Sequence, residues 1–431
     1  MALRPQDLTG FDATPLGAPP PPAPPRRFSI WEITSWILPM APEHLRRVLA
    51  AHPDLPQGQA GTEGGTRWFT APDIARLRAH FAGPTQRPRW LPRRPETARA
   101  PLITLAQPLG RSGRSRAALT LAVGASLAGW RVLMIEADPA GTLARTLRCD
   151  GAGDGVLSIL AREAAQTLRR LNEGRFNRGE VPLPVDDLLA SAQGLRLNSL
   201  IRPSRWPGLD LLAPADPGLA ETDLGGSGLA LADLRISDWR QMLRGWQPWG
   251  ALARALDEAG PASLRGRYDF ILCDPGPGLG PLALSMLASA DVLLAPLRPG
   301  GADRLTLGLE ALGAAMALVQ SEAQMTARAL GQGAPDMGWR SLAVLAMGAG
   351  SPALPAGFAA KPGVHLLSAA LPDSPGGASH LYDIDYRSLG RLAYAPLRAG
   401  TEAALAGLMA HLAGLWEQDV ALQGQFLLSS T

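Results

Sequence analysis

Residues 103–119 combine an apolar run, a turn that contains glycine and a stretch of small helix-forming residues. This order predicts a strand, a loop and a helix, and free backbone N–H groups at the start of such a helix favour an anionic phosphate. The strict phosphate-loop pattern G-x-x-x-x-G-K-[ST] is met only in part. Gly113 and Ser115 fit it, whereas Pro108 stands at the first glycine position and Arg114 at the lysine position. Taken alone, this stretch is open to two interpretations, a nucleotide site or an ordinary strand–turn–helix connection.

Two further stretches end an apolar strand with acidic residues. Residues 132–139 end with Glu136 and Asp138, which are two apart and therefore share one face of the strand. Residues 268–280 deliver Asp274 into a turn of proline and glycine. An acid at a strand end beside a phosphate loop can hold the water shell of Mg²⁺, and a second acid can orient an attacking water. Each acid alone is more often a capping or turn residue, but the three stretches in this order favour a nucleotide and magnesium site.

Apolar runs that read as strands recur through the body of the chain, with helical stretches between them. They span residues 102–106, 132–135, 209–212, 270–273, 292–296 and 342–347. This alternation predicts an α/β fold, a doubly wound and mostly parallel sheet of the P-loop type over residues 102–431. Ligands of such sheets bind at the carboxyl ends of the strands, where the three acidic and glycine-containing stretches would meet. Residues 220–240 are expected to form an insertion or a surface loop.

The bulk properties are those of a globular protein with more than one folded unit. The chain has 431 residues, 46% of them hydrophobic and 18% charged. No charge-free apolar stretch reaches the roughly 20 residues of a membrane span. The N-terminus lacks an apolar signal region, and Cys149 and Cys273 make no disulfide framework. We therefore expect a cytoplasmic protein without membrane contact.

Basic residues concentrate near the N-terminus. The first 100 residues hold 13 basic and 8 acidic side chains, and the other residues hold 28 and 30. A basic N-terminal portion suits contact with nucleic-acid phosphates. It is equally compatible with an arginine-rich solvated surface, since Lys361 is the only lysine.

The chain before the α/β body divides by composition into three segments. Residues 1–27 are rich in proline and predict a flexible arm, either a plain solvated tail or one whose Arg26 and Arg27 touch an acidic partner. Residues 28–82 follow as a small unit, described below. Residues 83–101 hold five prolines and five arginines, which is typical of a stiff basic linker and offers added contacts to phosphate.

Residues 28–82 predict two short helices, a glycine-rich hairpin and a third helix that Thr70 caps. That order is the layout of a winged helix-turn-helix DNA reader. Arg46 and Arg47 on the second helix and Arg67 on the wing are the candidate DNA contacts. A small protein-docking module is the alternative interpretation.

The chain also carries several stretches in the order found in one protein family. Residues 132–139 are similar to V-L-x-I-D-x-D-P-Q, and residues 270–297 to D-x-x-P-G-L-G-x-L-x-x-x-A-L-x-A-A-D-x-x-L-x-P. Residues 201–215 and 381–385 add to the match, which runs from about residue 28 onwards. The sequence thus resembles the ParA superfamily of partition ATPases with a deviant Walker A loop. It is most similar to RepA-type plasmid-partition members that have an N-terminal winged helix-turn-helix.

This resemblance implies ATP and Mg²⁺ as cofactors, ATP-dependent dimerisation and non-specific DNA binding by the homodimer. It also implies operator binding, stimulation by a partner of the ParB or RepB type, and association with a nucleoid or plasmid in the cytoplasm. The family loop reads K-G-G-x-G-K-[ST]. Gly110, Gly113 and Ser115 match it, whereas the signature lysine falls on Leu109, the second glycine on Arg111 and the phosphate lysine on Arg114.

The departures from the family loop bear on catalysis. Leu109 has no charge to reach a nucleotide across the dimer, and the guanidinium of Arg114 is longer and bulkier than an ammonium. By resemblance, Asp138 matches the catalytic water-positioning aspartate, and Asp274 matches the aspartate that, with Ser115, is associated with Mg²⁺. Glu136 stands where the family has its first aspartate.

The sequence therefore predicts a DNA-partition protein of the ParA and RepA type with weak or lost ATP hydrolysis. The alternative is a nucleotide-independent DNA-binding repressor or dimeric scaffold derived from the same fold. An active ATPase that uses Arg114 is a third interpretation.

Overall fold

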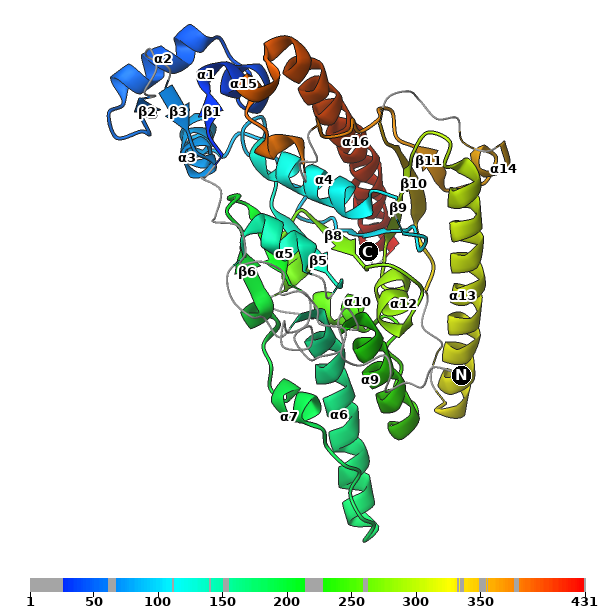
Figure 1. Cartoon of the computed structure of the whole chain (residues 1–431). Coiled ribbons are helices and arrows are strands. Elements are labelled where there is room, and N and C mark those ends of the chain that lie inside the picture. The colour runs from blue at the N-terminus through cyan, green and yellow to red at the C-terminus, as the bar shows by residue number, and fades with distance from the viewer. Residues whose placement is uncertain are drawn as a thin grey trace, which may run out of the picture.

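A computed structural model of the chain describes residues 26–60, 67–110, 112–138, 141–149, 155–213, 228–258, 263–331, 333, 337–348, 354, 356–375 and 380–429. An eight-stranded sheet forms the centre of these ranges, and a smaller unit with a three-stranded sheet lies to one side of it (Figure 1). Among the described helices, none combines the length and apolar character that crossing a membrane requires.

The central sheet is parallel except at one edge. Its strands are β4 (Leu102–Leu105), β5 (Val132–Glu136), β6 (Ile201–Pro203), β7 (Leu209–Leu212), β8 (Phe270–Asp274), β9 (Val292–Leu297), β10 (Ser341–Ala346) and β11 (Val364–Leu366). They lie in the order β11-β10-β9-β4-β8-β5-β7-β6, and only β6 runs antiparallel to its neighbour. The expected doubly wound, mostly parallel fold is confirmed, and all six predicted strands are present.

Side chains alternate between the two faces of the sheet, as the pleat of a strand requires. Val132 and Met134 pack in the same apolar cluster as α4 (Arg114–Ala128) and α16 (Arg391–Ser429). Leu133 and Ile135 pack in a second cluster with the helices α6 (Gly155–Asn177), α9 (Gly228–Met242), α10 (Ala251–Leu256) and α12 (Pro281–Ala288). Both faces are thus covered by helices, which explains why the strands are continuous apolar runs.

The helices of the body are α4 (Arg114–Ala128), α5 (Thr142–Leu147), α6 (Gly155–Asn177), α7 (Asp187–Ala192), α9 (Gly228–Met242), α10 (Ala251–Leu256), α11 (Leu264–Arg267), α12 (Pro281–Ala288), α13 (Ala302–Ala329), α14 (Ala356–Ala359), α15 (Tyr386–Leu389) and α16 (Arg391–Ser429). Two 3-10 turns, Leu197–Leu200 and Leu381–Asp383, complete the body. Helix α9 corrects the expectation of a loop at 220–240, because residues 228–240 are helical and bury Ile236 and Trp239 against the sheet-covering helices. Residues 220–227 lie outside the described residues.

Residues 28–82, here called the N-terminal unit, have the expected order of two helical segments, a hairpin and a third helix. The elements are β1 (Phe28–Ser29), α1 (Ile30–Glu32), a π-helix (Ile33–Ile37), α2 (Pro42–Ala51), β2 (Gln59–Ala60), β3 (Arg67–Phe69) and α3 (Ala71–Ala82). Thr70 caps α3 as expected, because its side chain accepts a hydrogen bond from Asp73 N while the Asp73 carboxylate accepts one from Thr70 N. Most of the hairpin tip, residues 61–66, lies outside the described residues.

The N-terminal unit packs firmly on the body. Its Trp31, Trp36 and Trp68 form an aromatic cluster with Tyr386 and Tyr394, and the centroids of the Trp31 and Tyr386 rings are 5.0 Å apart. On another side, buried residues of the unit share one continuous apolar core with α4 and α16. The orientation of the unit relative to the sheet is therefore fixed by packing.

Arg26 also belongs to this packed region, although it was expected at the end of a flexible arm. Its side chain is buried, and it donates to Glu32 Oε1 and to Tyr382 O, the latter at 2.9 Å. Its acidic partner is thus a residue of the same chain. Arg27 is exposed, and residues 1–25 lie outside the described residues.

Candidate nucleotide site and nucleic-acid interface

The phosphate loop connects β4, a central strand of the sheet, to α4. Gly113 is the N-cap of α4 and has φ +83°, a left-handed conformation that glycine adopts without strain. Leu109 and Gly110 lie earlier in the loop, where Leu109 N donates to Gln107 Oε1 at 3.3 Å. Arg111 lies outside the described residues. The loop thus has the shape that leaves backbone N–H groups at the start of a helix.

Ser115 and Asp274 meet at this helix start. The Ser115 hydroxyl donates to Asp274 Oδ2 at 2.5 Å, although the two residues are 159 positions apart. Asp274 ends β8, which is the neighbour of β4, and its other oxygen accepts from Gly276 N at 3.4 Å. A hydroxyl and a carboxylate at the start of a helix are oxygen ligands of the kind that Mg²⁺ prefers. The residues present therefore fit a magnesium ion at this position.

Arg114 contacts the turn that follows β8. Its side chain is buried, and Nη1 donates to Gly276 O at 2.6 Å. Burial lowers the pKa of Arg114, while the nearby carboxylates of Asp274 and Asp138 raise it. The guanidinium thus contacts the turn after β8 with one of its N–H groups, and its planar, longer side chain is not equivalent to the compact ammonium of a lysine at the same place.

Glu136, at the end of β5, and Asp138, just after it, lie beside Ser115 and Asp274 but make different contacts. Glu136 is paired with Asp274 in the strand register, yet its carboxylate accepts from Leu143 N at 2.8 Å and Ala144 N at 2.9 Å. It therefore caps α5. Asp138 is half-buried and follows the strand, and a Cβ placed on Gly276 would lie 3.4 Å from it. The structure thus brings Asp138 to the same edge as Ser115 and Asp274.

Glu136 should make stability depend on pH. Burial raises the pKa of its carboxyl from 4.5 to about 7, the two bonds to α5 lower it in part, and the charges of Asp274 and Asp138 raise it. Between pH 4.5 and pH 7 the Glu136 carboxyl is protonated in the folded chain but ionised in the unfolded chain. The contribution of Glu136 to the free energy of unfolding is therefore lost as the pH rises from about 4.5 to 7. Glu136→Gln should lack this loss. Thermal melts of both proteins from pH 4.5 to 8 test it, and a difference in melting temperature that does not change with pH would contradict the assignment.

The three candidate DNA contacts lie on the surface of the N-terminal unit, at the end of the molecule formed by α2 and the β2–β3 hairpin (Figure 1). Helix α2 buries Leu45 and Leu49 and leaves Arg46 and Arg47 exposed. Arg46 forms a solvent-exposed ion pair with Glu43 at 3.1 Å, which is a weak interaction. Arg67 is exposed as well and donates to Gln57 O at 2.9 Å.

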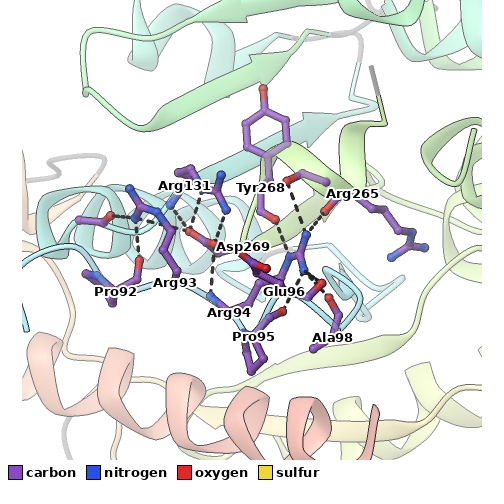
Figure 2. Close-up of polar contacts among 12 residues, drawn as sticks. Pro92, Arg93, Arg94, Pro95, Glu96, Ala98, Arg131, Arg265, Tyr268 and Asp269 are labelled. Atoms are coloured by element: carbon purple, nitrogen blue, oxygen red, sulfur yellow. Dashed lines mark hydrogen bonds and ion pairs between the residues drawn. The ribbon is translucent and has the colours of Figure 1, made fainter. Parts of the chain in front are cut away.

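The basic segment 83–101 is anchored to the body instead of crossing solvent. Figure 2 shows Arg93, Arg94 and Arg131 around Asp269, whose carboxylate is completely buried. Arg131 Nη2 lies 2.8 Å from Asp269 Oδ1, and Arg94 N donates to the same oxygen at 3.3 Å. Arg94 Nε also donates to Tyr268 O at 3.1 Å. The guanidinium groups of Arg93 and Arg94 are thus held by the body, and phosphate contacts from this segment stay a prediction.

Sequence reasoning missed two arginines that contact the loop from elsewhere. Arg304, in the first turn of α13, donates from Nη2 to Gly110 O at 2.8 Å. Arg298, which follows β9, lies against Gly113. Neither belongs to a motif, and the only signal in the sequence is the position of Arg298 directly after an apolar strand.

Comparisons with known proteins agree with this architecture. No family model matches the sequence. The chain is 25% identical over 286 residues to the "Putative replication protein A" of Sinorhizobium fredii. This alignment covers 66% of this chain and 60% of that relative. It is also 34% identical over 108 residues to the plasmid partition protein A of Escherichia coli, and this alignment covers 25% of this chain and 23% of that relative. The chain thus spans less than two thirds of the length of either relative.

One solved structure, described as a partition protein, has the same fold. It matches with a TM-score of 0.52 at 14% identity and covers 90% of this chain and 92% of that protein. The chain is thus similar in sequence to a replication protein and a plasmid partition protein, and it shares the fold of a solved partition protein.

Proposed function

We propose that this chain is a DNA-partition protein of the ParA and RepA type that binds ATP with Mg²⁺ and hydrolyses it slowly or not at all. The observation that carries the proposal is the contact between Ser115 and Asp274 at the N-terminus of α4, with Asp138 at the same edge. Gly110, Gly113 and Ser115 would hold the phosphates. Ser115 and Asp274 would hold the ion, which would neutralise phosphate charge when bound.

Slow hydrolysis follows from the two positions where the family has lysine. Leu109 carries no charge, and Arg114 directs Nη1 to Gly276 O instead of to the loop. Charge that develops on the phosphates in a transition state would thus meet fewer preorganised cations than a lysine loop supplies. Asp138 would still be available to position water.

Thermal melting tests nucleotide binding directly. A ligand that binds only the folded state raises the free energy of unfolding with the logarithm of its concentration relative to Kd, and the melting temperature rises accordingly. We expect ATP with Mg²⁺ to raise the melting temperature of the full chain. If millimolar ATP does not raise the melting temperature, the nucleotide part of the proposal fails. The alternative is then a nucleotide-independent DNA-binding repressor or dimeric scaffold, and the contact between Arg114 and Gly276 favours it.

The N-terminal unit supplies the proposed DNA contact through Arg46, Arg47 and Arg67. Arg46→Ala and Arg67→Ala should each weaken binding of duplex DNA by roughly tenfold and reduce the slope of log affinity against log salt by about one, because each removes a phosphate contact. Fluorescence anisotropy across a salt series measures both. Arg328→Ala, an exposed arginine at the far end of α13, is the matched control.

If Arg46→Ala and Arg67→Ala leave the affinity and the salt slope of the full chain unchanged, the N-terminal unit is a protein-docking module instead.

The proposed function also includes a partner of the ParB or RepB type and a homodimer of this chain. Light scattering of the full chain with and without ATP tests the dimer.

A further inference from the structure

Arg298 lies in the turn between β9 and α13, and its guanidinium rests against the phosphate loop. A Cβ built on Gly113 would lie 3.1 Å from Arg298 Nη2 and 3.4 Å from Nε. Because Gly113 has no side chain, the guanidinium reaches the backbone where α4 begins. The turn that carries it is held by a hydrogen bond of 2.9 Å from Gly301 N to Arg298 O.

The guanidinium of Arg298 has only weak partners within the part of the chain that the structure describes. Its Nη1 lies 3.4 Å from Asp373 Oδ1, and the same oxygen lies 3.6 Å from Arg116 Nη1. Asp373 is about half exposed, with 49% of its side chain accessible. Ion pairs of this length and exposure contribute little to stability. Arg298 therefore keeps donors that an anion in the loop can use.

The loop receives its positive charge from the element beside it. Arg304 holds Gly110 O from the first turn of α13, and Arg298 lies over Gly113 at the other end of the loop. By contrast, the loop itself has Leu109 at one lysine position and directs Arg114 to the turn after β8. A planar guanidinium can bind two phosphate oxygens at once.

We propose that Arg298 is a phosphate-binding residue, which contacts the phosphate oxygens of a bound nucleotide in place of the lysines missing from the loop. The inference rests on the proposed function, since it takes the loop to bind nucleotide. Asp373 pairs weakly with the guanidinium and would compete with phosphate for it. Removing the charge of Asp373 should therefore act in the opposite direction from removing that of Arg298.

Titration of the full chain with a fluorescent ATP analogue in the presence of Mg²⁺ tests this inference. We expect Arg298→Gln to weaken binding about tenfold, the size of effect that corresponds to one lost charge-assisted contact. Asp373→Asn should bind at least as tightly as the natural chain, because it frees Arg298 and Arg116. Arg328→Gln makes the same charge change on the exposed end of α13 and should change nothing. Melting temperatures without nucleotide check that every variant is folded.

The outcomes separate this inference from the function on which it rests. If the natural chain binds the analogue and Arg298→Gln binds it equally well, the inference is wrong and the nucleotide function stands. If Asp373→Asn weakens binding as much as Arg298→Gln does, the pair is structural and the inference is again wrong. If the natural chain binds no analogue, both the nucleotide function and the role of Arg298 are overturned.

Discussion

Arg78→Met is expected to lower the free energy of unfolding by about 3 kcal/mol, because it leaves buried carbonyl oxygens without a donor. Arg78 lies on α3, and only 4% of it is exposed. Its Nη1 donates to Trp90 O at 2.9 Å, and its Nη2 donates to Ile37 O at 2.6 Å and to Leu127 O. Burial lowers the pKa of Arg78 to about 10, and the charge of Glu402 raises it, so the side chain is charged at neutral pH.

The contact with Leu127 gives this prediction a functional side. Leu127 is in the last turn of α4, where a cation is favoured by the helix dipole and by carbonyls that lack an intrahelical partner. The other end of α4 is the phosphate loop. Arg78 therefore joins the N-terminal unit to the helix that carries the candidate nucleotide site.

Urea denaturation of the full chain measures the effect. Arg76→Met is the matched control, because Arg76 lies on the same helix but is exposed, and we expect a change within about 0.5 kcal/mol. Methionine keeps the apolar stem of Arg78, so packing loss contributes little. A loss under about 1 kcal/mol in Arg78→Met, beyond that of the control, would show that these hydrogen bonds do not hold the unit on the body.

Asp274→Asn is expected to remove the effect of Mg²⁺ on ATP affinity while the protein stays folded. Asparagine can still accept the hydrogen bond that Ser115 donates to Asp274, so the local structure is kept. It has no charge for a divalent ion. A charge-assisted contact is worth roughly 1.5–3 kcal/mol, so ATP affinity in Mg²⁺ should fall by about 10- to 100-fold.

Titrations of the natural chain and the variant with a fluorescent ATP analogue, with Mg²⁺ or with a chelator, measure this effect. In the natural chain we expect Mg²⁺ to tighten binding, and in Asp274→Asn we expect equal affinity under both conditions. Asp54→Asn, an exposed aspartate of the N-terminal unit, should behave like the natural chain. If Asp274→Asn retains the full effect of Mg²⁺, Asp274 is not part of a metal site.

The sheet could be predicted because its central strands are buried on both faces and therefore appear as continuous apolar runs. The two edge strands β6 and β11 could not. Each has three residues, and β6 contains Arg202 and Pro203 while β11 leaves His365 and Leu366 exposed. Short edge strands with polar or exposed residues have no pattern that separates them from loops.

The place of the candidate site was predictable, but the direction of its charged groups was not. Parallel strand order brings Ser115 and Asp274 together, because neighbouring strands end at the same edge. The contact of Arg114 with Gly276 O depends on the path of the turn after β8. The role of Glu136 as a cap depends on α5, a six-residue helix that the sequence pattern did not indicate.

The segment 83–101 shows a further limit of composition. Prolines and arginines are typical of an extended basic linker and equally of a segment packed on a surface. The difference is made by Asp269, a buried carboxylate at the start of β8 that lies 175 positions from Arg94 in the sequence. No local pattern reports a partner at that separation.

We propose that the phosphate loop binds nucleotide with Mg²⁺ but lacks the cations for fast hydrolysis. One experiment tests both halves, a titration of the full chain with a fluorescent ATP analogue and Mg²⁺ together with phosphate release from ATP in the same preparation. We predict saturable binding and turnover far below about 1 per second, the lower end of ordinary enzyme rates. Absence of binding at millimolar nucleotide, or turnover at about 1 per second or faster, would contradict the account.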